Sequence, residues 1–218
     1  PLLFVLIIDV FNRMIKLAIS NNLFEGIKLP NSNLAISNLQ FADDTILFAS
    51  PTVNHIHCLK VALYTFELIS GLSINFSKSS IIMLGNSDHL GPTFSNLLNC
   101  SIAHFPISYL GVPLRPTKLL RSDWLPLITK IENRLLSWKA HSLSSAGRLV
   151  LVKSVLSTIP SYWMSIYKLP TWVIKKIDSI KSSFLWNGGK IKKLVNWRTA
   201  CLHTDNGGLG IVNLYYFN

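Results

Sequence analysis

Two short apolar runs separated by an acidic pair most constrain the fold of this chain. Residues 34–40 and 45–49 have strand-like composition, and Phe41-Ala42-Asp43-Asp44 lies between them. Strands separated by so few residues pair as an antiparallel hairpin, so both aspartates are expected at its tip, reaching into a common open groove. A hairpin among helical patterns favours an α+β fold.

Helical periodicity flanks this hairpin. Residues 1–20 carry apolar side chains at i, i+3 and i+4 spacing over so broad a face that this helix is expected to be mostly buried. Residues 53–69 form a second helical pattern, which begins after Thr52 and ends at Gly71. Further expected elements are a strand over 79–84, a short helix over 90–98 and a hairpin over 108–114.

Charge and pattern divide the chain near residue 115. Residues 1–110 hold 5 basic and 6 acidic residues, a net charge of −1, whereas residues 111–218 hold 16 and 4, a net charge of +12. The later region carries helical patterns over 122–139, 144–157 and 171–186. We therefore expect two regions, 1–115 and 116–218. The positive charge of the second indicates a polyanionic partner, most often nucleic acid.

Cysteine usage and apolar content exclude several classes of protein. Cys58, Cys100 and Cys201 form neither a disulfide framework nor a zinc set, so no disulfide partner is expected. The apolar run over residues 1–8 meets Asp9 too soon for a membrane span, which needs about 20 residues, so no membrane partner is expected. Hydrophobic residues make up 49% of the chain, which excludes a disordered protein.

Asp43 and Asp44 are the only adjacent acids in the sequence. Two neighbouring carboxylates repel each other, and a divalent cation removes that cost. Mg²⁺ prefers carboxylate oxygens together with water and phosphate oxygens, so the pair is a candidate Mg²⁺ site. Taken alone, the pair is better explained as a polar turn, in which Asp is common.

The residues around the pair resemble a known family. Residues 39–48, Leu-Gln-Phe-Ala-Asp-Asp-Thr-Ile-Leu-Phe, resemble the Tyr/Phe-Ala-Asp-Asp hairpin of reverse transcriptases, in the form found in plant non-LTR (LINE-type) retrotransposons. Residues 1–4 resemble the end of that family's GDPLSPLLF segment. Other family motifs follow in order: SGLxxNxxKS at 71–79, the primer-grip YLGxPL at 108–114, and a downstream run matched at 136–139, 146–149, 184–186 and 207–211.

This resemblance implies a fold and a function. Residues 1–115 would be part of a reverse transcriptase palm, and residues 116–218 a mostly helical thumb or connector. The implied activity is that of an RNA-directed DNA polymerase, a nucleotidyl transfer with two Mg²⁺ ions, or Mn²⁺, held partly by Asp43 and Asp44. The implied partners are an RNA template, a DNA primer, dNTP and the remainder of the polymerase chain. The location stays open, and the resemblance implies the nucleus only if the chain is expressed as part of a functional element.

Further site residues follow from the resemblance. Lys78 matches a position that approaches the departing pyrophosphate, although a plain surface lysine after a turn fits as well. Leu110 and Gly111 would let a hairpin backbone approach the primer, or would form a simple tight turn. Three basic residues could contact phosphates, although each alone would be an ordinary solvated charge: Lys139, Arg148 and Lys153.

The sequence also departs from the family pattern. The family's first catalytic Asp, which precedes the GDPLSPLLF segment, has no counterpart here, and Asp9 lies in a helical pattern where a surface role fits it. A zinc-knuckle or ribonuclease H segment is also missing. The chain alone is therefore expected to be inactive. The alternatives are a truncated, catalytically inactive retroelement remnant that only binds nucleic acid, and a basic helical structural protein, which the ordered motifs disfavour.

Overall fold

The computed structural model describes residues 2–28, 35–136, 138, 143–186 and 195–218. The chain forms two units, Pro1–Pro116 and Thr117–Asn218, which are described separately below. This division lies next to the boundary expected near residue 115. All the described strands belong to the N-terminal unit, and the C-terminal unit is helical.

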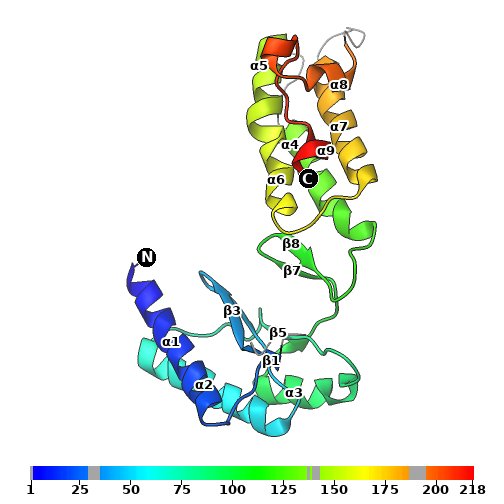
Figure 1. Ribbon diagram of the computed structural model, residues 1–218. Coiled ribbons are helices and arrows are strands. Elements are labelled where there is room, and N and C mark those ends of the chain that lie inside the picture. Colours follow the sequence, from blue (N-terminus) through cyan, green and yellow to red (C-terminus); the bar gives the residue numbers. More distant parts are fainter. Residues whose placement is uncertain (1, 29–34, 137, 139–142, 187–194) are drawn as a thin grey trace. The chain divides into compact units, whose positions relative to one another are not determined.

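Helices α1 (Leu2–Ser20), α2 (Val53–Ser70) and α3 (Gly91–Leu98) build the N-terminal unit, with the short η1 (Asp88–Leu90) before α3. Figure 1 shows α1 and α2 side by side, and the rings of Phe11 and Phe66 lie 5.0 Å apart between them. Helix α2 begins where the Thr52 hydroxyl accepts a hydrogen bond from the His55 amide. The core of the unit contains Phe11, Ile15, Phe24, Ile56, Leu59, Phe66, Phe94 and Leu98.

The burial of α1 differs from the expectation. Only Phe11 and Ile15 of this helix are buried, and Leu2 and Leu6 are 76% and 59% exposed. The expectation of a mostly buried helix is therefore wrong for the unit as described. The physical reason is that α2 and its neighbours cover one stripe of α1, whereas the apolar residues extend around most of its circumference.

The strands of the N-terminal unit form separate two-stranded ladders. Three are antiparallel and the β5–β6 ladder is parallel. The expected α+β class is confirmed. The described residues, however, contain no single antiparallel sheet. Of the strand predicted over residues 79–84, only Ser80–Ile81 is a strand in the structure. The pairs are β1 (Ile27–Lys28) with β2 (Ala35–Ile36), β3 (Asn38–Phe41) with β4 (Asp44–Leu47), β5 (Ser80–Ile81) with β6 (Ser101–Ile102), and β7 (Ile107–Tyr109) with β8 (Val112–Leu114).

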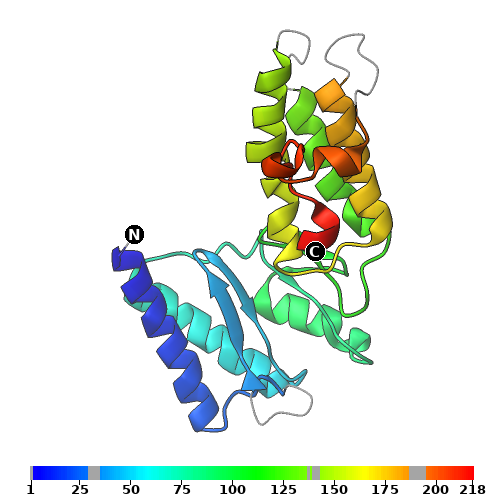
Figure 2. The ribbon, with the colours of Figure 1, turned by 45° about the horizontal axis from the view of Figure 1, so that its top comes forward.

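Three long helical segments build the C-terminal unit. They are α4 (Leu125–Leu136), the continuous run of α5 (Ser145–Leu151), the π-helical η4 (Val152–Leu156) and α6 (Thr158–Met164), and α7 (Thr171–Trp186). Figure 2 shows these segments packed side by side. The most buried core side chains include Leu127, Ile131, Val152, Leu156, Trp163, Val173, Ile177 and Leu214. The shorter elements are η2 (Ser122–Trp124), α8 (Trp197–Ala200), η5 (Thr204–Asn206) and α9 (Leu214–Phe217).

In the part of the chain that the structure describes, no helix combines the length and the apolar character that a bilayer crossing requires.

Candidate functional site

The acidic pair lies at the end of the β3–β4 hairpin. Phe41 pairs with Asp44, so Ala42 and Asp43 form a two-residue turn between the strands. Ala42 adopts a φ of 51°, the left-handed conformation that such tight hairpin turns need. The predicted hairpin is confirmed: Asp43 belongs to the turn, and Asp44 is the first residue of β4.

The hairpin is anchored at its base and open at its tip. The Asn38 side chain donates a hydrogen bond to the Asn12 side chain of α1 over 2.5 Å, and the Phe48 amide donates to the Ser37 carbonyl over 2.8 Å. At the tip, Asp43 and Asp44 are both exposed. Neither carboxylate forms an ion pair with another residue that the structure describes. The hairpin is therefore fixed at its base and carries two accessible carboxylates at its tip.

The donor set at the tip fits a hard divalent cation in kind but not in number. Carboxylate oxygens are the ligands that Mg²⁺ and Mn²⁺ prefer. Within the described residues, however, no group of three or more His, Cys, Asp or Glu side chains is placed to hold a metal ion. Asp43 and Asp44 would therefore supply one side of a metal site, and the remaining ligands would come from elsewhere.

Lys78 lies on a turn that Asn75 stabilises. The Asn75 side-chain oxygen accepts hydrogen bonds from the Lys78 amide over 3.1 Å and from the Ser77 hydroxyl over 2.6 Å. The Lys78 side chain is exposed. This position agrees both with a surface lysine after a turn and with a lysine available to a phosphate, so its predicted role stays a prediction.

The second hairpin has a two-residue loop. Tyr109 pairs with Val112, and Leu110 and Gly111 between them adopt φ values of 51° and 78°. Two successive positive φ angles define the tight type I′ turn, and glycine takes this conformation without steric cost. The turn prediction is confirmed, and the contact of Leu110 and Gly111 with a primer stays a prediction.

The three basic residues predicted to contact phosphates differ in their placement. Lys139 lies outside the described residues. Lys153, in η4, is exposed, and its ammonium group lies beside Gly210. Arg148, in α5, is buried, with 4% of its surface exposed.

Arg148 has a structural role in the C-terminal unit. Its guanidinium donates hydrogen bonds to the carbonyls of Leu185 and Leu143 over 3.1 and 3.0 Å, and to the Ser145 hydroxyl over 3.2 Å. A guanidinium so enclosed is not accessible to a phosphate. The predicted phosphate contact of Arg148 is therefore wrong, because its donors connect α5 to the end of α7 inside the protein.

A buried polar cluster that the sequence analysis did not identify lies on α7. Lys181 is fully buried and Asp178 is half-buried beside it. Burial lowers the pKa of Lys181 to about 8, while the nearby Asp178 favours its charged form. Burial also raises the pKa of Asp178 and raises that of Cys201 to about 11. The sequence contained a signal for this cluster, because Lys181 follows Ile174 and Ile177 at helical spacing and so lies on the apolar face of α7.

The chain is similar over part of its length to a known protein. The chain is 32% identical over 103 residues to an Arabidopsis thaliana protein named "Putative ribonuclease H protein At1g65750". The match covers 46% of this chain and 17% of that protein, so the chain spans only a small part of its relative. No protein-family model matches the chain.

Proposed function

We propose that this chain is a fragment of an RNA-directed DNA polymerase of a non-LTR retrotransposon. The observation that carries the proposal is the Phe-Ala-Asp-Asp hairpin. Asp43 lies in its two-residue turn and Asp44 is the first residue of β4, and both are exposed. Tightly turned, solvent-accessible carboxylates suit a metal-dependent nucleotidyl transfer. The finer assignment of residues 1–115 to a palm and residues 116–218 to a thumb or connector belongs to this proposal.

The partial relative supports a nucleic-acid enzyme as the parent protein. Its name is that of a ribonuclease, and the match covers only a small part of its length. A long retroelement protein with both polymerase and ribonuclease H segments would account for that name and for the motifs of this chain. The proposed partners are accordingly an RNA template, a DNA primer and dNTP.

In this proposal, the chain's own residues have separate tasks. Asp43 and Asp44 would supply the ligands on one side of the metal site. Asn38 of β3 anchors their hairpin through its hydrogen bond to Asn12. Bound Mg²⁺ or Mn²⁺ would supply positive charge to the reacting phosphate. Lys78 would offer a cation to the pyrophosphate, and the Leu110-Gly111 turn would position the primer strand.

Paramagnetic broadening tests the metal site in the 218-residue chain. Trace Mn²⁺ should broaden the amide NMR signals of residues 42–45 before those of other regions, because the ion would reside near the two carboxylates. The Asp43→Asn/Asp44→Asn variant should lose this selective broadening. Asp88→Asn, which removes another exposed acid of the same unit, should keep it. Uniform broadening in the wild-type chain would contradict the metal site.

Primer extension tests the activity. The 218-residue chain should not incorporate dNTPs, because two-metal catalysis needs carboxylates from a second strand. When the protein also carries upstream sequence with an Asp-bearing strand, Asp43→Asn or Asp44→Asn should lower incorporation by about a hundredfold or more, because the metals set the reacting geometry. Robust Mg²⁺-dependent extension by the 218-residue chain would contradict this assignment of ligands.

The alternative function is that of an inactive remnant that only binds nucleic acid. The buried Arg148 and the incomplete ligand set at the hairpin tip are both compatible with it. The reading frame upstream separates the two proposals. An Asp-bearing strand there favours the polymerase, whereas a stop codon or an unrelated exon favours the remnant.

A further inference from the structure

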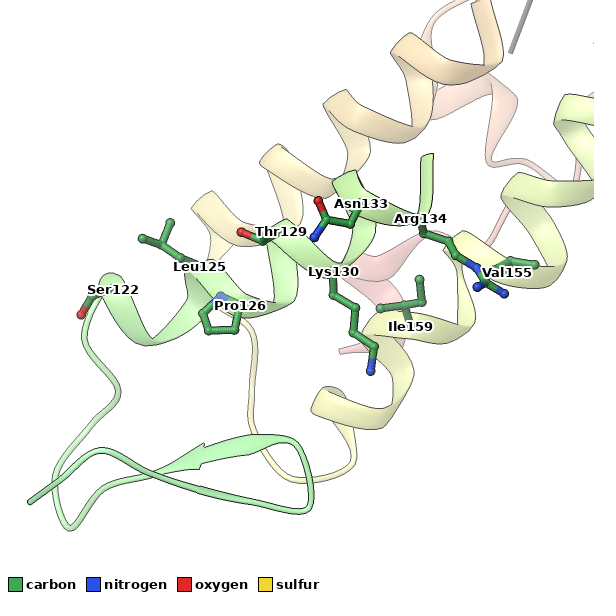
Figure 3. Close-up of a pocket in the computed structure, with 9 residues that line it drawn as sticks. All are labelled: Ser122, Leu125, Pro126, Thr129, Lys130, Asn133, Arg134, Val155 and Ile159. Atoms are coloured by element: carbon green, nitrogen blue, oxygen red, sulfur yellow. The ribbon is translucent and has the colours of Figure 1, made fainter. Parts of the chain in front are cut away.

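A broad groove runs between α4 and the η4–α6 segment of the C-terminal unit. It encloses about 1030 Å³. The wall formed by η2 and α4 carries five polar side chains, none of them acidic: Ser122, Thr129, Lys130, Asn133 and Arg134. Figure 3 shows Lys130 and Arg134 extending from α4 toward Ile159 and Val155 on the opposite side.

The two cations of the groove lie one helical turn apart. Lys130 and Arg134 are both exposed, and their i, i+4 spacing separates them by about 6 Å along the helix axis. In a duplex, one strand places a phosphate about every 3.4 Å along the helix axis, so this length spans about two phosphate steps of that strand. Thr129 and Asn133 have the same spacing on the same wall and add uncharged hydrogen-bond donors.

The acids of the C-terminal unit are engaged away from this groove. Asp123 is buried and accepts a hydrogen bond from the Leu120 amide over 2.7 Å. Glu132 lies 3.7 Å from Lys176 of α7, and Asp205 lies 3.2 Å from His203. Asp178 belongs to the buried cluster with Lys181. None of the four lines the groove, so no carboxylate there opposes an anionic ligand.

We propose that this groove binds the sugar–phosphate backbone of a nucleic-acid strand. Lys130 and Arg134 would contact two phosphates of one strand, about two steps apart, and Thr129, Asn133 and Ser122 would donate further hydrogen bonds. This inference rests on the proposed function, which requires a nucleic-acid partner. It places the contact on α4, instead of on Arg148, whose side chain lies inside the protein.

The side chains of the groove favour a nucleic acid over an acidic protein segment. Lys, Arg, Ser, Thr and Asn are the residue types that contact phosphate and sugar. Protein partners usually insert aromatic anchors into a closed pocket, whereas this open groove has an aliphatic floor of Leu125, Pro126, Val155 and Ile159. The unit is also strongly basic as a whole, which attracts a polyanion irrespective of base sequence.

The test is a salt titration of the complete 218-residue chain with a labelled 20-base-pair RNA–DNA hybrid, followed by fluorescence anisotropy. The Lys130→Gln/Arg134→Gln variant should reduce the slope of log affinity against log salt by about 2, because two phosphate contacts are lost. At 0.1 M salt the same loss should weaken binding by roughly 10- to 60-fold.

Two matched controls make the result specific. Lys168→Gln/Lys175→Gln removes the same charge from exposed positions of the unit that do not line the groove. This control should change the slope by less than half as much. Thr129→Glu adds a negative charge on the groove wall without removing a cation, and should weaken binding clearly more than Ser179→Glu on α7. Circular dichroism verifies that each variant is folded.

The outcomes separate this inference from the proposed function. Equal slopes in the groove variant and its control, with wild-type binding intact, would overturn the groove and leave the proposed function standing. An absence of wild-type binding at 50 mM salt would count against both. A third outcome would be that poly-L-glutamate binds and needs Lys130 and Arg134, whereas the hybrid binds without them. This result would overturn nucleic-acid binding in the groove in favour of an acidic protein partner.

Discussion

The Nζ atom of Lys181 lies 3.4 Å from the Oγ atom of Ser157, and both side chains are buried in the C-terminal unit. This neutral hydroxyl is a weak partner for an ammonium group. Desolvation therefore dominates and lowers the pKa of Lys181 to about 8. The buried lysine connects α7 to Ser157, directly after η4. Because its pKa is lowered, the free energy of unfolding of this unit varies with pH in the alkaline range.

We predict that the unit becomes more stable between about pH 8 and pH 9. In this range Lys181 releases its proton in the folded state, whereas an unfolded lysine keeps it up to its ordinary pKa of 10.5. The unfolded state then binds more protons, so the free energy of unfolding rises with pH, by about 1 kcal/mol over the interval. Urea unfolding at a series of pH values measures the change.

Cys201 should end this rise. Its pKa is raised from 9.0 to about 11, so above pH 9 the thiol loses its proton in the unfolded state before it does so in the folded state. The contribution of Cys201 to the free energy of unfolding therefore falls with pH, whereas that of Lys181 rises. A Cys201→Ala variant should therefore continue to gain stability beyond pH 9, up to about pH 10. In Lys181→Met the rise between pH 8 and 9 should disappear, and a persistent rise there would assign it to another group.

Replacing Arg148 by Met should destabilise the C-terminal unit by about 3 kcal/mol. The change removes charge-assisted hydrogen bonds to Leu185, Leu143 and Ser145 and leaves buried acceptors without their donor. Arg198→Met, at an exposed position of α8, should change stability by less than about 0.5 kcal/mol. Urea midpoints compare the two, and similar midpoints would contradict the structural role of Arg148.

Ala42→Gly should stabilise the N-terminal unit by about 0.5–1 kcal/mol. Ala42 has a φ of 51°, a conformation that is strained for a residue with a side chain and free of strain for glycine. The same change at Ala62, in the interior of α2, should destabilise the unit by about 1 kcal/mol. Thermal unfolding of both variants measures the signs, and destabilisation by Ala42→Gly would argue against the turn.

The adjacent glycines 207 and 208 should respond differently to alanine. A Cβ atom on Gly208 would lie 2.0 Å from the Leu202 carbonyl oxygen, a backbone atom that cannot move aside. Gly207 has open space but a φ of 75°, so alanine there costs only about 1 kcal/mol of backbone strain. Gly208→Ala should therefore lower the melting temperature several degrees further than Gly207→Ala.

Much of the local structure was predictable from the sequence because it depends on neighbouring residues. The long helices α1, α2 and α7 follow apolar spacing, and both hairpins follow from their turns. The separation of the strands into independent ladders depends on contacts between distant residues, which no local pattern specifies. The same holds for the exposure of α1, because a pattern predicts an apolar face but not what covers it.

The candidate site was predictable only in part. The hairpin tip follows from Asp43 and Asp44 and their flanking strands. The role of Arg148 was missed because a basic residue is usually solvated, and only the path of the chain brings the Leu185 carbonyl next to it. The groove that contains Lys130 and Arg134 forms between two helical segments, so its shape depends on their packing.

The π turn at η4 keeps two helices in phase. Arg148, Val152, Leu156 and Pro160 are all buried and recur at every fourth residue. An α-helix advances about 100° per residue, so three such steps would rotate the buried face by about 120°. The wider turn, in which the Ser157 amide donates to the Val152 carbonyl, offsets this rotation. Deleting one residue from this segment would leave a regular helix but would turn Trp163 away from the interior by about 100°.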